Sequence, residues 1–314
     1  MTDFQAQVNV AQAPAVEGDF CDKNPRSSYD AGQGGLVAGV NGVVVGRFAW
    51  ATPPNDSDGA PSVVSNSGFG LPSGFVHREQ QALITQYLAA SGNTIQPGFG
   101  LTLMTGGGFW AKNIGTAVAE YGMKAYANFA DGRVTFALTG AATVGGTSTA
   151  STIAAGTASV TGTISDNVLT VTAVGSGTLY PGGQLSGTGV APNTQIVSQL
   201  SGTAGGLGTY LLNVGEQSVA STTISETYGL LTIGGTVTSG YAVNQLVTGA
   251  GIAAGTYITA NGTGTGAAGT YIVNLTQTIS SQAINTAVNV ETKYYARSTG
   301  LTGELVKISN VPNA

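Results

Sequence analysis

The sequence has very little of the side-chain chemistry that most enzymes and metal sites use. It contains one cysteine and one histidine, Cys21 and His77, in 314 residues. A single cysteine excludes an internal disulfide framework and fits synthesis in a reducing cytoplasm. Cys21 lacks a recognisable nucleophile context, and we expect His77 to be a hydrogen-bonding histidine. We therefore expect no catalytic residue, no cofactor and no metal site, because a metal site needs several histidines, cysteines or clustered carboxylates.

Charge is equally scarce. Only 8% of the residues are charged, against roughly 25% in an ordinary soluble domain. No lysine or arginine occurs between Arg133 and Lys293, so all ten basic residues lie in the flanks. The basic footprint of a nucleic-acid-binding protein is therefore absent. No apolar run reaches the length of a transmembrane helix, and the N-terminus lacks the basic and apolar regions of a signal peptide, so no membrane partner is expected.

What the sequence does have is glycine and β-branched residues. Glycine accounts for 49 residues, and 42% of the chain is hydrophobic, so the composition is not that of a disordered protein. The abundance of threonine, valine and isoleucine between glycine-rich breaks favours strands joined by tight turns. We expect an all-β protein with a surface made polar by threonine, serine, asparagine and glutamine, which fits contact with other protein.

The cation-free middle of the chain repeats itself. Segments that begin at Gln184 and Gly208 recur at Gln245 and Gly269, with a period of 61–62 residues. The equivalent positions are Thr194 and Thr256, Tyr210 and Tyr271, and Asn213 and Asn274. A period of this length predicts two tandem small β domains, at residues 145–225 and 226–287. The composition on either side predicts that they interrupt one discontinuous domain, residues 1–140 plus 288–314.

Local patterns predict several elements in this discontinuous domain. Residues 1 to about 30, interrupted by prolines, are typical of an extended arm. Two hairpins are expected, one within 35–51 around Asn41-Gly42 and one within 124–138 around Asp131-Gly132. Residues 78–92 have the apolar spacing of one short helix, with Gly92 at its C-terminal cap.

The flanking segments resemble the structural cement, or capsid decoration, proteins of tailed bacteriophages. The resemblance is carried by residues 18–51, 74–92, 97–112 and 290–309, in family order. Its most specific motifs are Asn24-Pro25-Arg26, Gly46-Arg47-Phe48-Ala49 and Phe109-Trp110. It implies a jelly-roll or barrel-like β-sandwich on the outer surface of the virion, made in the host cytoplasm. The implied partner is an HK97-type major capsid protein, whose subunit joints the protein would stabilise.

This resemblance gives a set of interface candidates and leaves alternatives open. Candidate contacts with the capsid or with a second copy are Arg26, Arg47, Trp50, Arg78, Trp110 and Arg297. Symmetric joints favour a homo-oligomer, a trimer slightly over a dimer. The alternative is a surface adhesin or tail-fibre-like module that binds host glycans through the repeats, with Tyr180, Tyr210, Tyr257 and Tyr271 as the candidate aromatic platform. An enzyme such as a depolymerase is the least favoured possibility.

Overall fold

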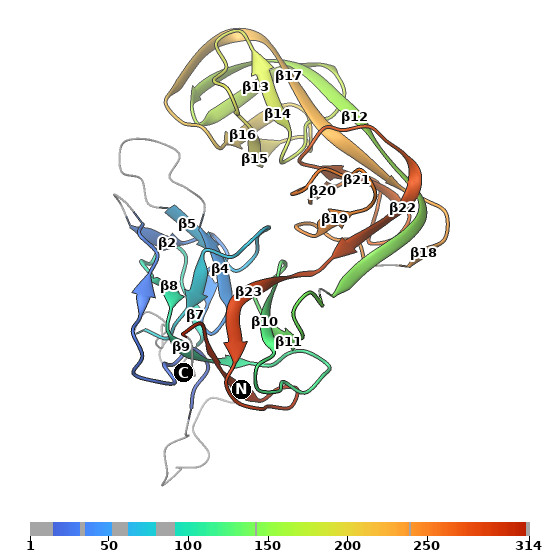
Figure 1. Ribbon diagram of the computed structural model, residues 1–314. Helices are drawn as coiled ribbons and strands as arrows, with labels where there is room; N and C mark the ends of the chain where they lie inside the picture. Colours follow the sequence, from blue (N-terminus) through green and yellow to red (C-terminus); the bar gives the residue numbers. More distant parts are fainter. Residues whose placement is uncertain are drawn as a thin grey trace, which may run out of the picture. The chain divides into compact units, whose positions relative to one another are not determined.

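The computed structural model describes residues 15–31, 35–51, 62–79, 92–141, 143–238 and 240–311. All regular structure in these residues is β, and they contain no helix, so the predicted all-β class is confirmed. The helix expected over 78–92 falls almost entirely outside them. The chain forms two compact units (Figure 1). One, the base unit, combines a part that ends at Thr143 with a part that begins at Asn289; the other, the insert unit, is Val144–Val288.

The base unit contains two larger sheets and one small one. The six-stranded sheet has the order β1 (Ser27–Ser28), β8 (Leu103–Gly106), β6 (Gly74–Val76), β4 (Phe48–Ala51), β5 (Ser62–Ser65), β2 (Leu36–Ala38). The five-stranded sheet has the order β11 (Val134–Ala137), β10 (Lys124–Asn128), β23 (Asn289–Ala296), β24 (Leu305–Ser309), β9 (Gly108–Lys112). The small sheet pairs β3 (Val43–Val44) with β7 (Thr94–Ile95). Neighbouring strands are antiparallel except for β2 and β5.

Aromatic rings join the two larger sheets. Phe48 and Phe75 from the six-stranded sheet meet Phe109 and Tyr294 from the five-stranded sheet, with ring centroids 5.0–6.1 Å apart. All four side chains are at most 1% exposed. The six-stranded sheet also buries its opposite face, in an aliphatic cluster that includes Val64, Val76, Leu103 and, from the small sheet, Val43 and Ile95. The five-stranded sheet keeps part of its second face open to solvent.

The chain leaves and re-enters the base unit at two adjacent points. The Thr143 N–H donates to Asn289 Oδ1 at 2.9 Å, and Asn289 Nδ2–H donates to Thr143 Oγ1 at 3.0 Å. One residue further, Val144 is the register partner of Ala287. The ends of the insert unit therefore lie side by side.

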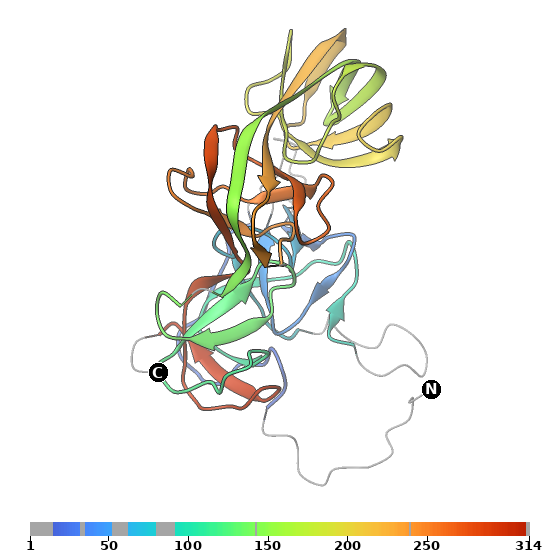
Figure 2. The same ribbon diagram turned by 90° about the vertical axis from the view of Figure 1, so that its right-hand side faces the viewer.

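The insert unit is one eleven-stranded sheet assembly built on two long strands, β12 (Val144–Asp166) and β17 (Gln217–Ile233). These strands run antiparallel from one end of the unit to the other (Figures 1 and 2). The shorter strands near one end are β13 (Val168–Ser176), β14 (Gln184–Gly187), β15 (Ile196–Gly202) and β16 (Gly208–Leu212). Those near the other end are β18 (Val237–Thr238), β19 (Leu246–Thr248), β20 (Ile258–Asn261), β21 (Gly269–Val273) and β22 (Ile279–Ala287).

Each end of the insert unit has its own hydrophobic core. The first core includes Leu169, Tyr210 and Ile224, and the second includes Leu231, Tyr271 and Ile284. Ile153, from the first half of β12, belongs to the second core, although the sequence-based bounds assign it to the first repeat. The bounds 145–225 and 226–287 therefore differ from core membership, because both long strands pass through both cores.

Equivalent positions in the two repeats make equivalent contacts. The Oγ1–H groups of Thr194 and Thr256 donate to the carbonyls three residues earlier, at 2.8 and 2.7 Å. The hydroxyls of Tyr210 and Tyr271 donate to the carbonyls four residues earlier, at 2.7 and 2.8 Å. Both tyrosines are at most 1% exposed, so these sequence matches are core positions.

Two expectations for the base unit need correction. The hairpin expected around Asn41-Gly42 is wrong: β2 before the turn pairs with β5, and β3 after it pairs with β7. The described part of the expected arm, residues 15–31, is packed. Its backbone exchanges hydrogen bonds with β9, for example from the Cys21 N–H to the Gly108 carbonyl at 3.1 Å, and β1 joins the six-stranded sheet.

Candidate protein-binding face

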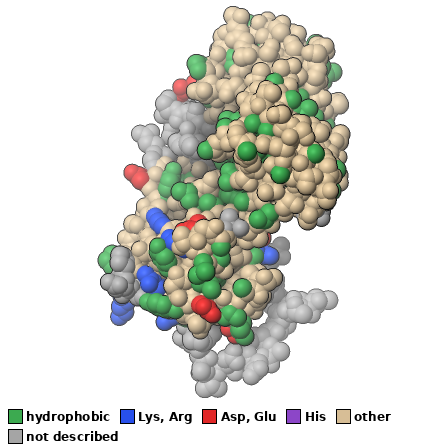
Figure 3. Space-filling view, turned by 45° about the vertical axis from the view of Figure 1, so that its right-hand side comes forward, with side chains coloured by type: hydrophobic (Ala, Val, Ile, Leu, Met, Phe, Trp, Pro, Cys, Tyr) green, Lys and Arg blue, Asp and Glu red, His purple; other side chains and the backbone are tan. Residues whose placement is uncertain are grey.

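The charged side chains are distributed unequally between the two units. All ten lysines and arginines lie outside Val144–Val288, and the insert unit carries only Asp166, Glu216 and Glu226. On the face shown in Figure 3, the surface of the insert unit is accordingly almost entirely uncharged. Any surface that recognises a partner through cations must therefore belong to the base unit.

Strand register gathers cations and aromatic rings on the open face of the five-stranded sheet. Lys307 of β24 is the register partner of Trp110 on β9. The Arg297 N–H donates to the Lys307 carbonyl at 2.7 Å, which places Arg297 beside Lys307. Tyr295 of β23 is in register with Lys124 of β10. We call the set Trp110, Tyr121, Lys124, Tyr295, Arg297 and Lys307 the aromatic–cation face.

Cation–π contacts organise this face. The Lys124 ammonium lies 3.8 Å from the Tyr295 ring centroid, and the Lys307 ammonium lies 5.2 Å from that of Trp110. The Arg297 guanidinium lies 5.7 Å from the Tyr295 ring and 5.8 Å from the Tyr121 ring. Contacts of this type fix the rings without burying them, and they strengthen when a partner excludes water.

The rings of the face remain accessible. Tyr121 is 64% exposed and Tyr295 is 36% exposed. Arg297 donates through Nη2 to the Val311 carbonyl at 3.0 Å, while its buried Nε–H has no partner among the described residues. The Lys124 ammonium lies 3.5 Å from Glu291 Oε1 and donates to the Thr292 carbonyl at 3.3 Å, and its side chain is only 11% exposed, so most of this charge is engaged within the protein. The face thus combines partly exposed aromatic rings with an arginine, residue types that are enriched in protein–protein interfaces.

Of the six residues proposed from the sequence, the structure brings two together on this face, Trp110 and Arg297. Arg26 is exposed elsewhere and stacks on Phe20, 3.5 Å from the ring centroid. Arg78 is engaged internally, donating to Asn93 Oδ1 and, at 3.4 Å, to the Glu17 carbonyl.

The other two candidates occupy different environments. Trp50 is only 9% exposed, and its Nε1–H donates to the Gly70 carbonyl at 3.2 Å, so its ring belongs to the core. Arg47 is half-buried at a separate cavity.

Sequence reasoning missed four members of the face: Tyr121, Lys124, Tyr295 and Lys307. A signal was present in the alternation of Lys293, Tyr295 and Arg297 with buried residues, which is the period of a strand with one open face. Placing Lys124 and Lys307 beside them required the pairing of strands from distant parts of the chain.

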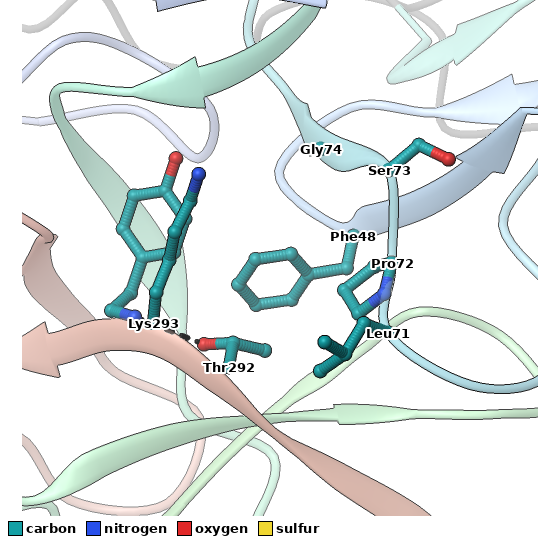
Figure 4. A pocket seen from close by; sticks show the side chains of 8 residues that line it. Phe48, Leu71, Pro72, Ser73, Gly74, Thr292 and Lys293 are labelled. Carbon is teal, nitrogen blue, oxygen red and sulfur yellow. Dashed lines mark hydrogen bonds between the residues drawn. The ribbon is translucent and has the colours of Figure 1, made fainter.

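A small apolar cavity of about 180 Å³ lies elsewhere in the base unit, lined by Phe48, Leu71, Pro72, Ser73, Gly74, Thr292, Lys293 and Tyr294. Figure 4 shows the rings of Phe48 and Pro72 and the side chain of Leu71 turned toward it. The Tyr294 N–H donates to Thr292 Oγ1 at 3.2 Å, the dashed contact in the figure. Burial raises the pKa of Tyr294, which keeps this phenol protonated.

The lone cysteine and histidine are held in structural contacts. Burial, reinforced by Asp22, raises the pKa of the Cys21 thiol to about 12, so it is protonated at neutral pH and a poor nucleophile. His77 is buried, stacks on Phe20, and its Nε2 lies 3.0 Å from Glu79 Oε1. Burial lowers the His77 pKa, which disfavours the charged form.

The described residues contain no group of three or more histidine, cysteine, aspartate or glutamate side chains able to hold a metal ion. The same part of the chain has no helix long and apolar enough to cross a membrane.

Comparison with known proteins identifies the family. The family model for the XM1 gp53 minor capsid protein matches residues 4–178, more than half of the chain. The match includes Trp110, Tyr121 and Lys124 and ends before β23 and β24. Searches of curated proteins and of solved structures found no match. The chain therefore belongs to the XM1 gp53 minor capsid protein family and is a phage capsid-associated structural protein of the virion.

Proposed function

We propose that this protein is a capsid cement, which binds the outer surface of an HK97-type shell and stabilises joints between major capsid protein subunits. The observation that carries the proposal is the aromatic–cation face. Arginine and large aromatic residues dominate interface energetics when they sit in desolvated patches. A joint formed only in the assembled shell would provide such a patch, and binding to it would stabilise the shell by mass action.

The face is better suited to protein than to nucleic acid. Its cations alternate with aromatic rings, Glu291 lies 3.5 Å from one of them, and the whole chain has a net charge of −5. Nucleic-acid binding relies on a dense basic field that neutralises many phosphates. A shell protein with acidic and apolar groups at its surface would meet this face through charge complementarity and ring burial.

We also propose that the protein is non-enzymatic. The protonated thiol of Cys21 and the contacts of His77 support a structural role for both. In this proposal the insert unit projects outward from the shell and extends the virion surface.

The glycan-binding alternative has weaker support. Tyr210 and Tyr271 are in the cores, and Tyr180 and Tyr257 are half-buried. An exposed aromatic platform, which glycan binding would favour, is absent from these four residues.

The proposal is tested by co-sedimentation of the purified protein with shells that lack it. Tyr295→Ala and Arg297→Ala should each weaken binding by about tenfold or more, the range of interface hot spots. Lys23→Ala, which removes an exposed cation outside the face, should bind as the natural protein does. Circular dichroism melts would verify that the variants are folded. Natural affinity in both folded face variants would contradict the proposed interface.

A further inference from the structure

The base unit has a second charged feature, formed by residues other than those of the aromatic–cation face. A cavity of about 220 Å³ is lined by Glu17, Arg47, Lys112, Ile114, Arg133 and Val134. Its wall is fixed by backbone bonding, since the Ile114 N–H donates to the Val134 carbonyl at 3.0 Å. Three of the six lining residues are cationic and only one is acidic. A molecule of water occupies about 30 Å³ in the liquid, so the cavity has room for a small ion with some of its hydration.

Much of the hydrogen-bonding capacity of the cations at this cavity is not used within the protein: Lys112 and Arg133 are exposed to solvent, and Arg47 is half-buried. The half-buried Arg47 guanidinium makes one hydrogen bond to the described residues, from Nη1 to the Asp131 carbonyl at 3.4 Å. Arg133 pairs through Nε with Asp131 Oδ2 at 3.2 Å. Among the described residues, the Lys112 ammonium has no ion-pair partner within 4 Å. A guanidinium has five N–H donors, so most of the donors at this site are available to a ligand.

Glu17 does not neutralise the cluster directly. It makes no ion pair within 4 Å in the described part of the chain. Burial raises the pKa of the Glu17 carboxyl, and the nearby charges of Arg47, Lys112, Arg133 and Arg78 oppose that shift only in part. Burial, followed by the charge of Arg133, lowers the pKa of Arg47, whereas Asp131 and Glu17 act in the opposite direction. An anion in the cavity would relieve the repulsion between the cations.

We propose that this cavity is a binding site for a small oxyanion, a phosphate or carboxylate group, held by Arg47, Lys112 and Arg133. The planar guanidinium fork matches the oxygen geometry of both groups, and lysine adds a point charge. Glu17 is the one acidic residue among those that line the cavity, so its protonation removes the charge that opposes a bound anion, and we expect binding to strengthen at lower pH. This site does not depend on capsid binding, so each proposal can fail without the other.

The test is isothermal titration of the full-length protein with inorganic phosphate and, separately, with acetate, each against sodium chloride at equal ionic strength. We expect saturable binding of at least one oxyanion and a thermal midpoint that rises with its concentration. Selective binding of phosphate or of acetate would identify which group the site takes. Heats and midpoints identical to those in chloride would overturn the proposal.

Substitutions of residues that line the cavity test whether the anion binds there. Lys112→Gln and Arg133→Gln should each weaken binding by about tenfold, the value of one charged hydrogen bond. Lys23→Gln removes the same charge at an exposed position outside the cavity and should leave the affinity for the anion unchanged. Glu17→Gln should retain binding and abolish its strengthening at lower pH, because the amide cannot titrate. Undiminished affinity in folded Lys112→Gln and Arg133→Gln would overturn the assignment of the cavity.

Discussion

At the residue scale, the two repeats use different side chains to accept a hydrogen bond from a corresponding backbone N–H group. Near the first core the carboxyl group of Glu226, 0% exposed, accepts the Tyr180 N–H through both oxygens, at 3.1 and 3.2 Å. In the second repeat the amide oxygen of Gln245 accepts the N–H of Ala242, which is 62 residues after Tyr180, at 3.1 Å. A neutral amide therefore suffices to accept this hydrogen bond, whereas Glu226 places a titratable carboxyl group in a hydrophobic core.

This difference predicts a pH-dependent stability. Burial raises the pKa of Glu226 from about 4.5 to about 8. Because the folded pKa is the higher one, the stabilising contribution is complete below pH 4.5 and is lost as pH rises to about 8. Glu226→Gln should raise the thermal midpoint of the insert unit at pH 8 and flatten its decline between pH 5 and 8.

Thermal unfolding monitored by circular dichroism at pH 5, 6.5 and 8 tests this expectation. Glu216→Gln removes the same charge from an exposed position in the same unit and serves as the control. A slope between pH 5 and 8 that is equal in Glu226→Gln and the natural protein would contradict the assignment.

The two tryptophans show that residue type alone does not predict whether a side chain is buried or faces outward. Trp50 and Trp110 both lie in short strands of the base unit, and both were expected at an interface. Trp50 packs over Gly68, where a Cβ atom would lie 2.4 Å from the Trp50 ring, whereas Trp110 faces outward beside Lys307. The difference depends on which sheet face the rest of the chain covers, and that information is not local to either strand.

At the element scale, the Asn41-Gly42 and Asp131-Gly132 turns show that a turn sequence alone does not determine which strands pair. The hairpin expected around Asp131-Gly132 is confirmed: β10 and β11 pair antiparallel, and Gly132 has a φ of 67°. Gly42 has a similar φ of 70°, and its N–H donates to the Gly39 carbonyl at 2.8 Å, so a turn forms there too. The strands beside it, three and two residues long, pair with distant segments instead. Turn residues predict that the chain reverses direction. Which strands then pair also depends on strand length and on partners that are distant in the sequence.

The Gly132 turn is also closely packed, which gives a prediction. A Cβ atom at Gly132 would lie 2.0 Å from the Phe48 carbonyl oxygen, in addition to the strain of its positive φ. Gly132→Ala should lower the free energy of unfolding of the base unit by about 3 kcal/mol, from strain and overpacking together.

Gly122→Ala is the matched control, since Gly122 has a φ of 88° and no atom within 4 Å of the added Cβ. It should cost only the conformational strain, about 1–2 kcal/mol. Urea unfolding of both variants measures the difference. Equal costs would show that the contact with Phe48 is relieved by movement of the loop.

At the scale of the whole molecule, the chain is a base with an insertion whose ends meet at Thr143 and Asn289. Replacing residues 145–286 by a short Gly-Ser turn should leave a folded base, because Val144 and Ala287 are already register partners. The measurement is a cooperative melt of the shortened protein, with the intact chain as reference. A product that only aggregates, without a cooperative transition, would contradict the insertion.

Assembly is the second expectation at this scale. We expect copies to meet around a symmetry axis of the shell, as a trimer more than as a dimer, through the base unit. Light scattering of the free protein and a density map of decorated shells test the stoichiometry and the orientation. Insert units lying against the shell floor would contradict the outward projection.

The central claim is that the protein stabilises a shell. The most direct test compares the temperature at which phage particles burst with the protein, without it, and after it is added back. The account predicts that particles lacking the protein burst at a lower temperature, that the natural protein restores them, and that Arg297→Ala restores them poorly. Equal burst temperatures with and without bound protein would contradict the account.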